Sequence, residues 1–247
     1  MATKNEYVNL TASDGTSLRA YVAHPPGTPR AGLLVFQEAF GVNAHIRDVT
    51  ERFAREGYLA ISPELFHRTA PGLEAGYTDF GAVMPHMQAL TDAGLTADIQ
   101  AAYGWLKNGE AKNLAVGATG YCMGGRTSIL AALTVPLACA VSYYGGGIAP
   151  SGFFPDLLGR LKNLNAPTML FWGGLDAHIP SEAVQAVTAA LSAAKKDYVN
   201  VVFSGADHGF FCDVRASYNP VAARQAWALT LEFFNTHLAG AAKQADA

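Results

Sequence analysis

Six apolar runs of seven or eight residues recur along the chain and show little alternation between apolar and polar positions. They are residues 31–37, 58–64, 113–119, 137–144, 166–173 and 199–205. Runs of this kind are typical of parallel strands that are covered by helices on both faces, because neither face of such a strand meets water. The sequence therefore predicts an α/β fold built around a mostly parallel central sheet.

The segments outside these runs complete the expected fold. Residues 6–12 and 17–25 are short and β-rich, and they flank the turn signal Ser13-Asp14-Gly15, which predicts an N-terminal antiparallel hairpin. Apolar residues at helical spacing predict helices between the strands. We expect these helices at 42–56, 87–107, 124–133 and 181–195, with a last one from Asn219-Pro220 onward.

The chain is expected to form a single domain over residues 1–247. Half of its residues are apolar and 15% are charged, and no repeat or linker interrupts the order of predicted elements. Residues 65–85 carry Gly, Pro and aromatics without steady periodicity, which predicts a loop or lid over a site. Residues 239–247 are interpreted as a frayed tail.

Charge and cysteine content narrow the possible partners. The net charge is −3 and no run of Lys or Arg is present, which argues against nucleic acid or an anionic membrane as a partner. No segment approaches the roughly 18 apolar residues of a membrane span, and the first residues do not resemble a secretory signal. Cys122, Cys139 and Cys212 lack metal-ligand spacing. We expect a cytoplasmic monomer or homodimer that uses neither a metal nor another cofactor.

The stretch Gly120-Tyr121-Cys122-Met123-Gly124 lies between a predicted strand and a predicted helix. This strand–turn–helix context is that of a nucleophile elbow, in which glycines two residues before and after the nucleophile leave room for its sharp turn. A helix N-terminus also favours the thiolate, which is the reactive form of cysteine. Cys122 is therefore the candidate nucleophile, and the alternative is an inert buried cysteine.

Two further residues complete a candidate triad in the order nucleophile, acid, histidine. Asp176 follows the predicted strand 166–173, and His208 follows the last predicted strand. The loops at the carboxyl ends of parallel strands meet in one crevice, so these side chains can converge on Cys122. Asp207 and His178 are neighbouring alternatives for the acid and the base.

The motifs "FQEAFGVN", "GYCMGG", "GGLDAHIP" and "DHGFFCD" together resemble the dienelactone hydrolase family of the α/β-hydrolase superfamily. The resemblance implies an α/β-hydrolase fold and cleavage of carboxylic esters or lactones through a thioester acyl-enzyme. It also implies that Glu38 contacts the resting thiol, and that the backbone N–H groups of Met123 and Ala39 hold the oxyanion. An alternative leaves Glu38 as a buried acid held by an arginine.

The substrate is less constrained than the reaction. Members that cleave the anionic dienelactone hold its carboxylate with two arginines, for which Arg68 and Arg215 are candidates here. Aromatic side chains suggest instead a pocket for a neutral or aryl ester. The candidate pocket residues are Phe40, Tyr77, Phe80, Tyr143, Tyr144, Phe210 and Phe211.

Two other functions are weighed against ester hydrolysis. A thiolate beside an oxyanion hole could also attack activated, uncharged phosphoryl esters. A non-catalytic homologue that binds a small ligand is a further alternative, although a binding protein has no need of a complete triad. The run Gly145-Gly146-Gly147 lacks the pattern of a phosphate-binding loop and is interpreted as a turn after a strand.

Overall fold

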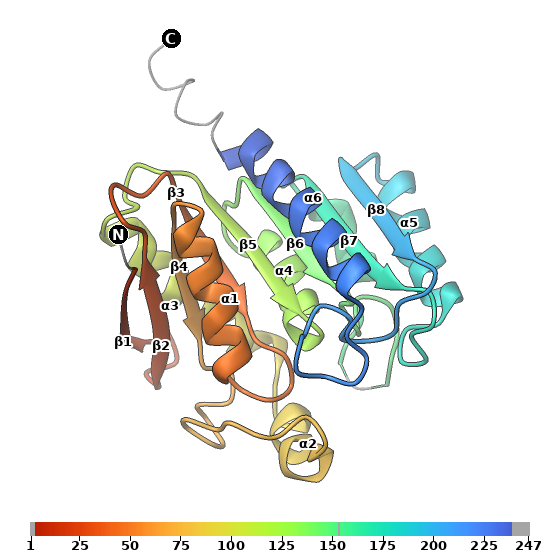
Figure 1. Cartoon of the computed structure of the whole chain (residues 1–247), viewed down its shortest axis with the longest axis horizontal. Helices are drawn as coiled ribbons and strands as arrows, with labels where there is room; N and C mark the ends of the chain where they lie inside the picture. Colours follow the sequence, from red (N-terminus) through yellow and green to blue (C-terminus); the bar gives the residue numbers. More distant parts are fainter. Residues whose placement is uncertain (1–2, 153, 239–247) are drawn as a thin grey trace.

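The computed structural model describes residues 3–152 and 154–238, which form an eight-stranded sheet in the order β1-β2-β4-β3-β5-β6-β7-β8 (Figure 1). All six apolar runs become strands, and residues 6–12 and 17–25 form the hairpin, as predicted. The strands are β1 Lys4–Thr11, β2 Ser17–His24, β3 Ala31–Phe36, β4 Tyr58–Pro63, β5 Val116–Tyr121, β6 Cys139–Tyr143, β7 Thr168–Gly173 and β8 Tyr198–Phe203.

The strand directions confirm a mostly parallel sheet. The hairpin strands β1 and β2 pair antiparallel, and β2 pairs antiparallel with β4. All pairings from β4 through β3, β5, β6 and β7 to β8 are parallel. Every residue of β3, β4, β5, β6 and β7 is buried, which explains why these strands show no alternation in the sequence.

Helices cover both faces of the sheet. In the view of Figure 1, α1 and α6 lie in front of the sheet, while α3, α4 and α5 lie behind it. The helices are α1 Ala44–Arg55, α2 Phe80–Gln88, α3 Asp92–Asn108, α4 Met123–Ala132, α5 Ser181–Ala193 and α6 Pro220–Leu238, with a short 3-10 helix at Leu158–Asn163. No helix among the described residues is both long and apolar enough to cross a membrane.

The expectation of one helix over 87–107 is wrong, because two helices meet near its start. Thr91 has extended backbone angles, and its hydroxyl accepts a hydrogen bond from the N–H of Gly94, which caps α3 and separates it from α2. The loop expected over 65–85 likewise ends at Asp79, whose carboxylate caps α2. The predicted tail at 239–247 lies outside the described residues.

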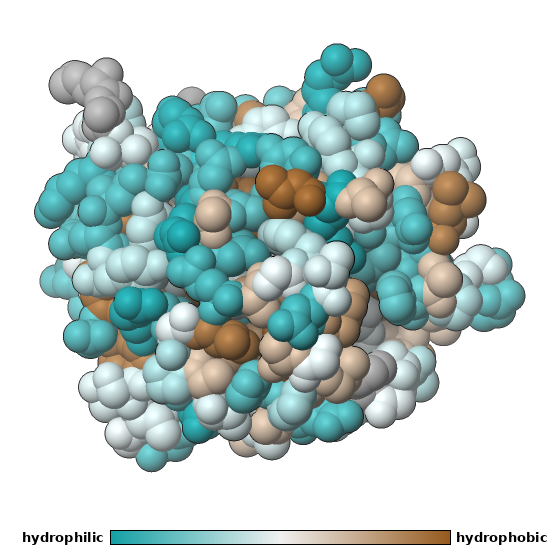
Figure 2. Space-filling model, turned by 60° about the horizontal axis from the view of Figure 1, so that its bottom comes forward, coloured by the Kyte–Doolittle hydropathy of each residue, from teal (hydrophilic) through white to brown (hydrophobic). Residues whose placement is uncertain are grey.

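The parallel strands end at the lower edge of the sheet in Figure 1, where α2 and the loops after β3, β5, β7 and β8 gather. Figure 2 turns this edge forward and shows small groups of hydrophobic residues within a largely hydrophilic surface. In open α/β sheets this edge is the usual position of a ligand site. The candidate residues of the sequence follow these same strands.

Candidate active site

Cys122 occupies a strained turn between β5 and α4. Its backbone angles are φ 56° and ψ −121°, in the positive-φ range that residues with a side chain rarely adopt. A side chain at Gly120 would place Cβ 1.9 Å from the carbonyl oxygen of Gly124, and one at Gly124 would place it 2.3 Å from that of Phe36. The predicted sharp turn and the need for both glycines are therefore confirmed.

Asp176 and His208 meet at the carboxyl ends of β7 and β8. His208 Nδ1 lies 2.7 Å from Asp176 Oδ2. The other carboxylate oxygen, Oδ1, accepts hydrogen bonds from the backbone N–H groups of His178 at 2.8 Å and Ile179 at 3.1 Å. Asp176 is thus fixed by its own loop, and its contact with Nδ1 orients the imidazole.

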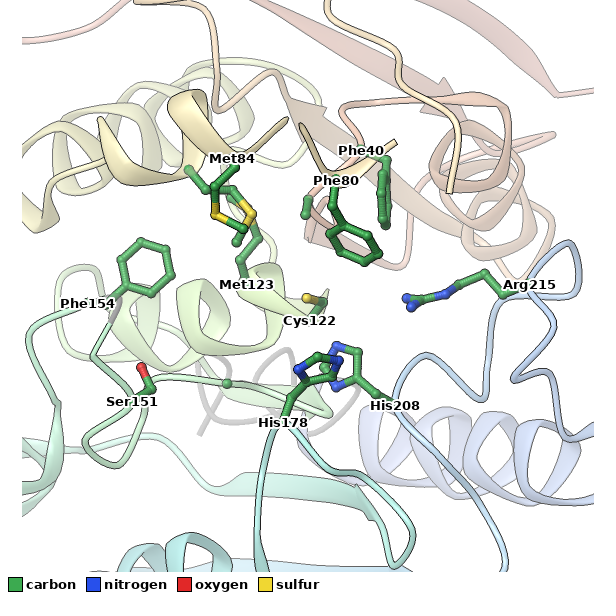
Figure 3. Close-up of a pocket in the computed structure, with 13 residues that line it drawn as sticks. Phe40, Phe80, Met84, Cys122, Met123, Ser151, Phe154, His178, His208 and Arg215 are labelled. Atoms are coloured by element: carbon green, nitrogen blue, oxygen red, sulfur yellow. The ribbon is translucent and has the colours of Figure 1, made fainter. Parts of the chain in front are cut away.

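The neighbouring carboxylate and histidine occupy different positions. Asp207 is exposed, and its Oδ1 accepts the backbone N–H of His208 at 2.6 Å, so it stays on the outer side of the loop. His178 lines the cavity, and its ring packs edge-on against the ring of His208 with the centroids 5.2 Å apart (Figure 3). The geometry brings Asp176, rather than Asp207, onto the imidazole of His208.

The proton affinity of His208 depends on its two partners. Burial alone would lower the pKa of this imidazolium, because a buried charge loses hydration. The negative charge of Cys122 and the hydrogen bonds with Asp176 and Cys122 outweigh that penalty, and they raise the pKa of His208 to about 10. His208 therefore favours its protonated, imidazolium form beside Cys122.

The two residues predicted to hold the oxyanion both line the cavity that contains Cys122. Met123 is the first residue of α4, so its N–H has no acceptor within the helix. Ala39 follows β3, and both residues line the same cavity as Cys122. That these two N–H groups and the helix N-terminus hold an anion formed at the thiol stays a prediction.

Glu38 lies fully buried at the end of β3, next to Arg215 from the loop that follows His208. Its Oε1 accepts a hydrogen bond from Arg215 at 3.3 Å, whereas Oε2 has no hydrogen-bond partner among the described residues. The guanidinium of Arg215 lies 5.7 Å from the ring centres of both Phe40 and Tyr77. Glu38 is thus held by an arginine. Its predicted contact with the resting thiol stays a prediction.

A cavity of about 210 Å³ opens above Cys122, and Figure 3 shows the residues around it. Phe40 and Phe80 line it, as expected. The further side chains that form its wall were not predicted from the sequence. They are Met84, Met87, Met123, Ser151, Phe154 and His178, and Arg215, a candidate from the sequence, lines the cavity as well.

The remaining predicted pocket residues lie elsewhere. Tyr77 packs behind Phe40, and its hydroxyl accepts a hydrogen bond from Asn43. Arg68 forms ion pairs with Asp14 and the buried Asp98, beside a separate small cavity, so its expected place in the pocket is wrong. Four aromatic residues are buried in the core behind the site and do not line the cavity. They are Tyr143, Tyr144, Phe210 and Phe211.

One signal for the missed wall is present in the sequence. Met84 and Met87 are three residues apart, which places them on one face of a helix. To recognise that face, one would have to know where α2 begins, and the irregular composition of residues 65–85 gives no sign of it. Within residues 3–152 and 154–238, no three His, Cys, Asp or Glu side chains are grouped so that they could hold a metal ion.

Comparisons with known proteins agree with this architecture. The model of the dienelactone hydrolase family matches residues 18–238. The "Putative carboxymethylenebutenolidase" of Synechocystis sp. is 37% identical over 228 residues, which cover 90% of this chain and 92% of the relative. The crystal structure of the "Putative Dienelactone Hydrolase" from Klebsiella pneumoniae subsp. pneumoniae is 34% identical, with a TM-score of 0.81 and coverage of 94% and 98%.

A second solved structure is similar in fold alone. It is a dienelactone hydrolase-like promiscuous phosphotriesterase from metagenomic libraries, with a TM-score of 0.82 and 22% sequence identity. The match covers 96% of this chain and 99% of that one.

Proposed function

The chain belongs to the dienelactone hydrolase family, and from this premise we propose that it hydrolyses carboxylic esters or lactones through Cys122, His208 and Asp176. One observation carries the proposal. The strained Cys122 opens into the 210 Å³ cavity together with His208, whose Nδ1 lies 2.7 Å from Asp176. A binding protein would have no use for a cysteine on a strained backbone beside an oriented imidazole.

In the first half of the proposed reaction, the thiolate of Cys122 attacks the carbonyl carbon of the ester. The carbonyl oxygen becomes an oxyanion that accepts hydrogen bonds from the N–H groups of Met123 and Ala39. When the C–O bond breaks, His208 gives its Nε2 proton to the leaving alkoxide. The acyl group then remains on the cysteine as a thioester.

In the second half, water attacks the thioester carbon while neutral His208 accepts one of its protons. The C–S bond breaks, the carboxylic acid leaves, and the thiolate–imidazolium pair is restored. Asp176 stabilises the imidazolium at both stages, which agrees with the raised pKa of His208.

We assign Glu38 and Arg215 to the resting state of the site. Arg215 holds Glu38 by one carboxylate oxygen, and the guanidinium lines the cavity. A substrate carboxylate could take the place of Glu38 on Arg215, which would free Glu38 to move toward or away from the thiol. Such coupling would make the thiolate available when substrate arrives, and it would limit oxidation of Cys122 in its absence.

The cavity supports esters with an apolar portion. Away from the proposed triad, the described charged residue that lines the cavity is Arg215, and the buried Glu38 already compensates its charge. The remaining wall is formed largely by Phe and Met side chains. A second candidate, the cleavage of uncharged phosphotriesters, rests on this same apolar wall, because such substrates bring no charge that needs a partner.

The test compares wild type with Cys122→Ala on p-nitrophenyl acetate and butyrate, with cis-dienelactone and paraoxon assayed in parallel. We expect wild-type turnover of the aryl esters and its loss in the variant. Equal rates for the two proteins would refute the thiol nucleophile. The ranking of the substrates separates neutral ester, anionic lactone and phosphotriester.

A further inference from the structure

Arg126 is a buried arginine that the reaction described above does not use. It lies on α4 one helical turn after Cys122, and it is 1% exposed. Burial lowers the pKa of this guanidinium against the opposing attraction of Asp92. Because a buried guanidinium loses its hydration, it needs compensating contacts, and the groups that supply them indicate what it holds in place.

Those contacts converge on the loop that follows β6. Arg126 Nε donates to the carbonyl oxygen of Gly147 at 3.1 Å, and Nη2 donates to that of Pro155 at 2.6 Å. The guanidinium carbon lies 4.9 Å from the ring centre of Phe154. Asp92, at the start of α3, supplies the counter-charge at 2.8 Å. One planar group thus binds the loop at both of its ends.

The same loop forms one wall of the cavity. Ser151 and Phe154 line it on the side of Cys122 opposite Arg215, near Met84 and Met123 (Figure 3). The cavity therefore has a charged side at Arg215 and an apolar side at Phe154. The position of the apolar side depends on a loop whose ends are tied to α4.

We propose that Arg126 is a positioning residue that sets substrate specificity, because it holds Phe154 in place as the wall that receives the apolar end of the substrate. This inference rests on the proposed ester hydrolysis. The substrate class that fits is an ester with a medium-length alkyl or an aryl group on this side, since flexible methionines beside a fixed aromatic ring accept apolar groups of several shapes.

The experiment measures kcat/KM for p-nitrophenyl acetate and octanoate in wild type, Arg126→Lys, Arg126→Met and Phe154→Ala. The acetyl group is too short to require the apolar wall, whereas the octanoyl chain needs it. We expect the octanoate-to-acetate ratio of kcat/KM to fall about tenfold in Arg126→Met and Phe154→Ala, mainly through KM, and less in Arg126→Lys. Arg160→Met is the matched control, because Arg160 also pairs with Asp92 but is partly exposed, and the octanoate-to-acetate ratio of this variant should stay unchanged.

Deuterium exchange gives a readout that does not depend on activity. The N–H of Leu157 donates to Ile148 within this loop at 2.9 Å, and its exchange should accelerate in Arg126→Met but not in Arg160→Met. A uniform loss of kcat for both esters, or unchanged exchange at Leu157, would overturn the proposal. If wild type hydrolyses neither ester, the proposed function fails, while the exchange measurement still decides whether Arg126 holds the loop. Phe154→Ala and Arg126→Lys keep the ratio test valid if Arg126→Met does not fold.

Discussion

Replacement of Cys122 by glycine should stabilise the protein relative to replacement by alanine. Both variants lack the thiol, so the comparison isolates the effect of Cβ on a backbone held at φ 56° and ψ −121°. A strained residue of this kind costs about 1–3 kcal/mol, and glycine removes most of that cost. Glycine also increases the entropy of the unfolded chain, which opposes the gain by about 0.4–1 kcal/mol.

The net expectation is that Cys122→Gly unfolds with a free energy about 1 kcal/mol greater than that of Cys122→Ala. For a chain of this size, the difference corresponds to a melting temperature about 2–4 °C higher. Thermal unfolding followed by circular dichroism measures it, together with chemical unfolding in guanidinium. Both variants should fail to hydrolyse p-nitrophenyl acetate, so greater stability accompanies loss of the proposed nucleophile.

The matched control is Ala189→Gly on the exposed face of α5. There the backbone is helical, and the same exchange of alanine for glycine should destabilise the protein by about 1 kcal/mol. If glycine in place of alanine raises the free energy of unfolding at position 122 and lowers it at position 189, the turn at Cys122 stores strain. If Cys122→Gly is no more stable than Cys122→Ala, the reasoning about the elbow is refuted.

Three further changes test the site. Asp176→Asn removes a group that raises the pKa of His208. As pH rises, the variant should therefore lose the imidazolium, and the activity that requires it, before the wild type does near pH 10. An unchanged alkaline limb in the pH profile of kcat/KM would contradict this. Gly124→Ala places Cβ 2.3 Å from a backbone carbonyl oxygen and should reduce the free energy of unfolding by about 3 kcal/mol, whereas Gly76→Ala, with nothing within 4 Å, should change it by less than about 0.5 kcal/mol in the same denaturation assay. Arg215→Met should reduce kcat/KM for cis-dienelactone about tenfold more than for p-nitrophenyl butyrate, and equal reductions would exclude a role in binding the substrate carboxylate.

The parallel sheet and its elbow could be predicted because their causes are local. A strand buried on both faces needs an apolar run, and a turn at which an added Cβ would lie 2.3 Å from a neighbouring carbonyl oxygen needs glycine. The order of the strands then places Cys122, Asp176 and His208 at one edge. Their meeting follows from the general geometry of open sheets, and it required no knowledge of side-chain contacts.

The pocket could not be predicted in the same way, because its wall depends on which side of a buried ring faces empty space. Phe210 and Phe211 follow His208 by two and three positions, yet both are core residues. Arg68 and Arg215 were equivalent candidates in the sequence, and contacts distant in the chain separate them. Asp98 on α3 holds Arg68 beside another cavity, and Glu38, just after the central strand β3, pairs with Arg215 at the site.

The two arginines near the site, the partly buried Arg215 and the buried Arg126, act on opposite sides of the cavity and in different ways. Arg215 presents its guanidinium to the cavity, where a substrate can compete for it, and its partner Glu38 retains an oxygen without a hydrogen bond. Arg126 presents its guanidinium to backbone carbonyl groups, which a substrate cannot reach without moving the loop. A charge that a ligand can displace suits recognition and switching, whereas a charge bound to the backbone suits a fixed wall. The apolar side of the cavity should therefore set how long a substrate can be, and the charged side should set whether an anionic group is accepted.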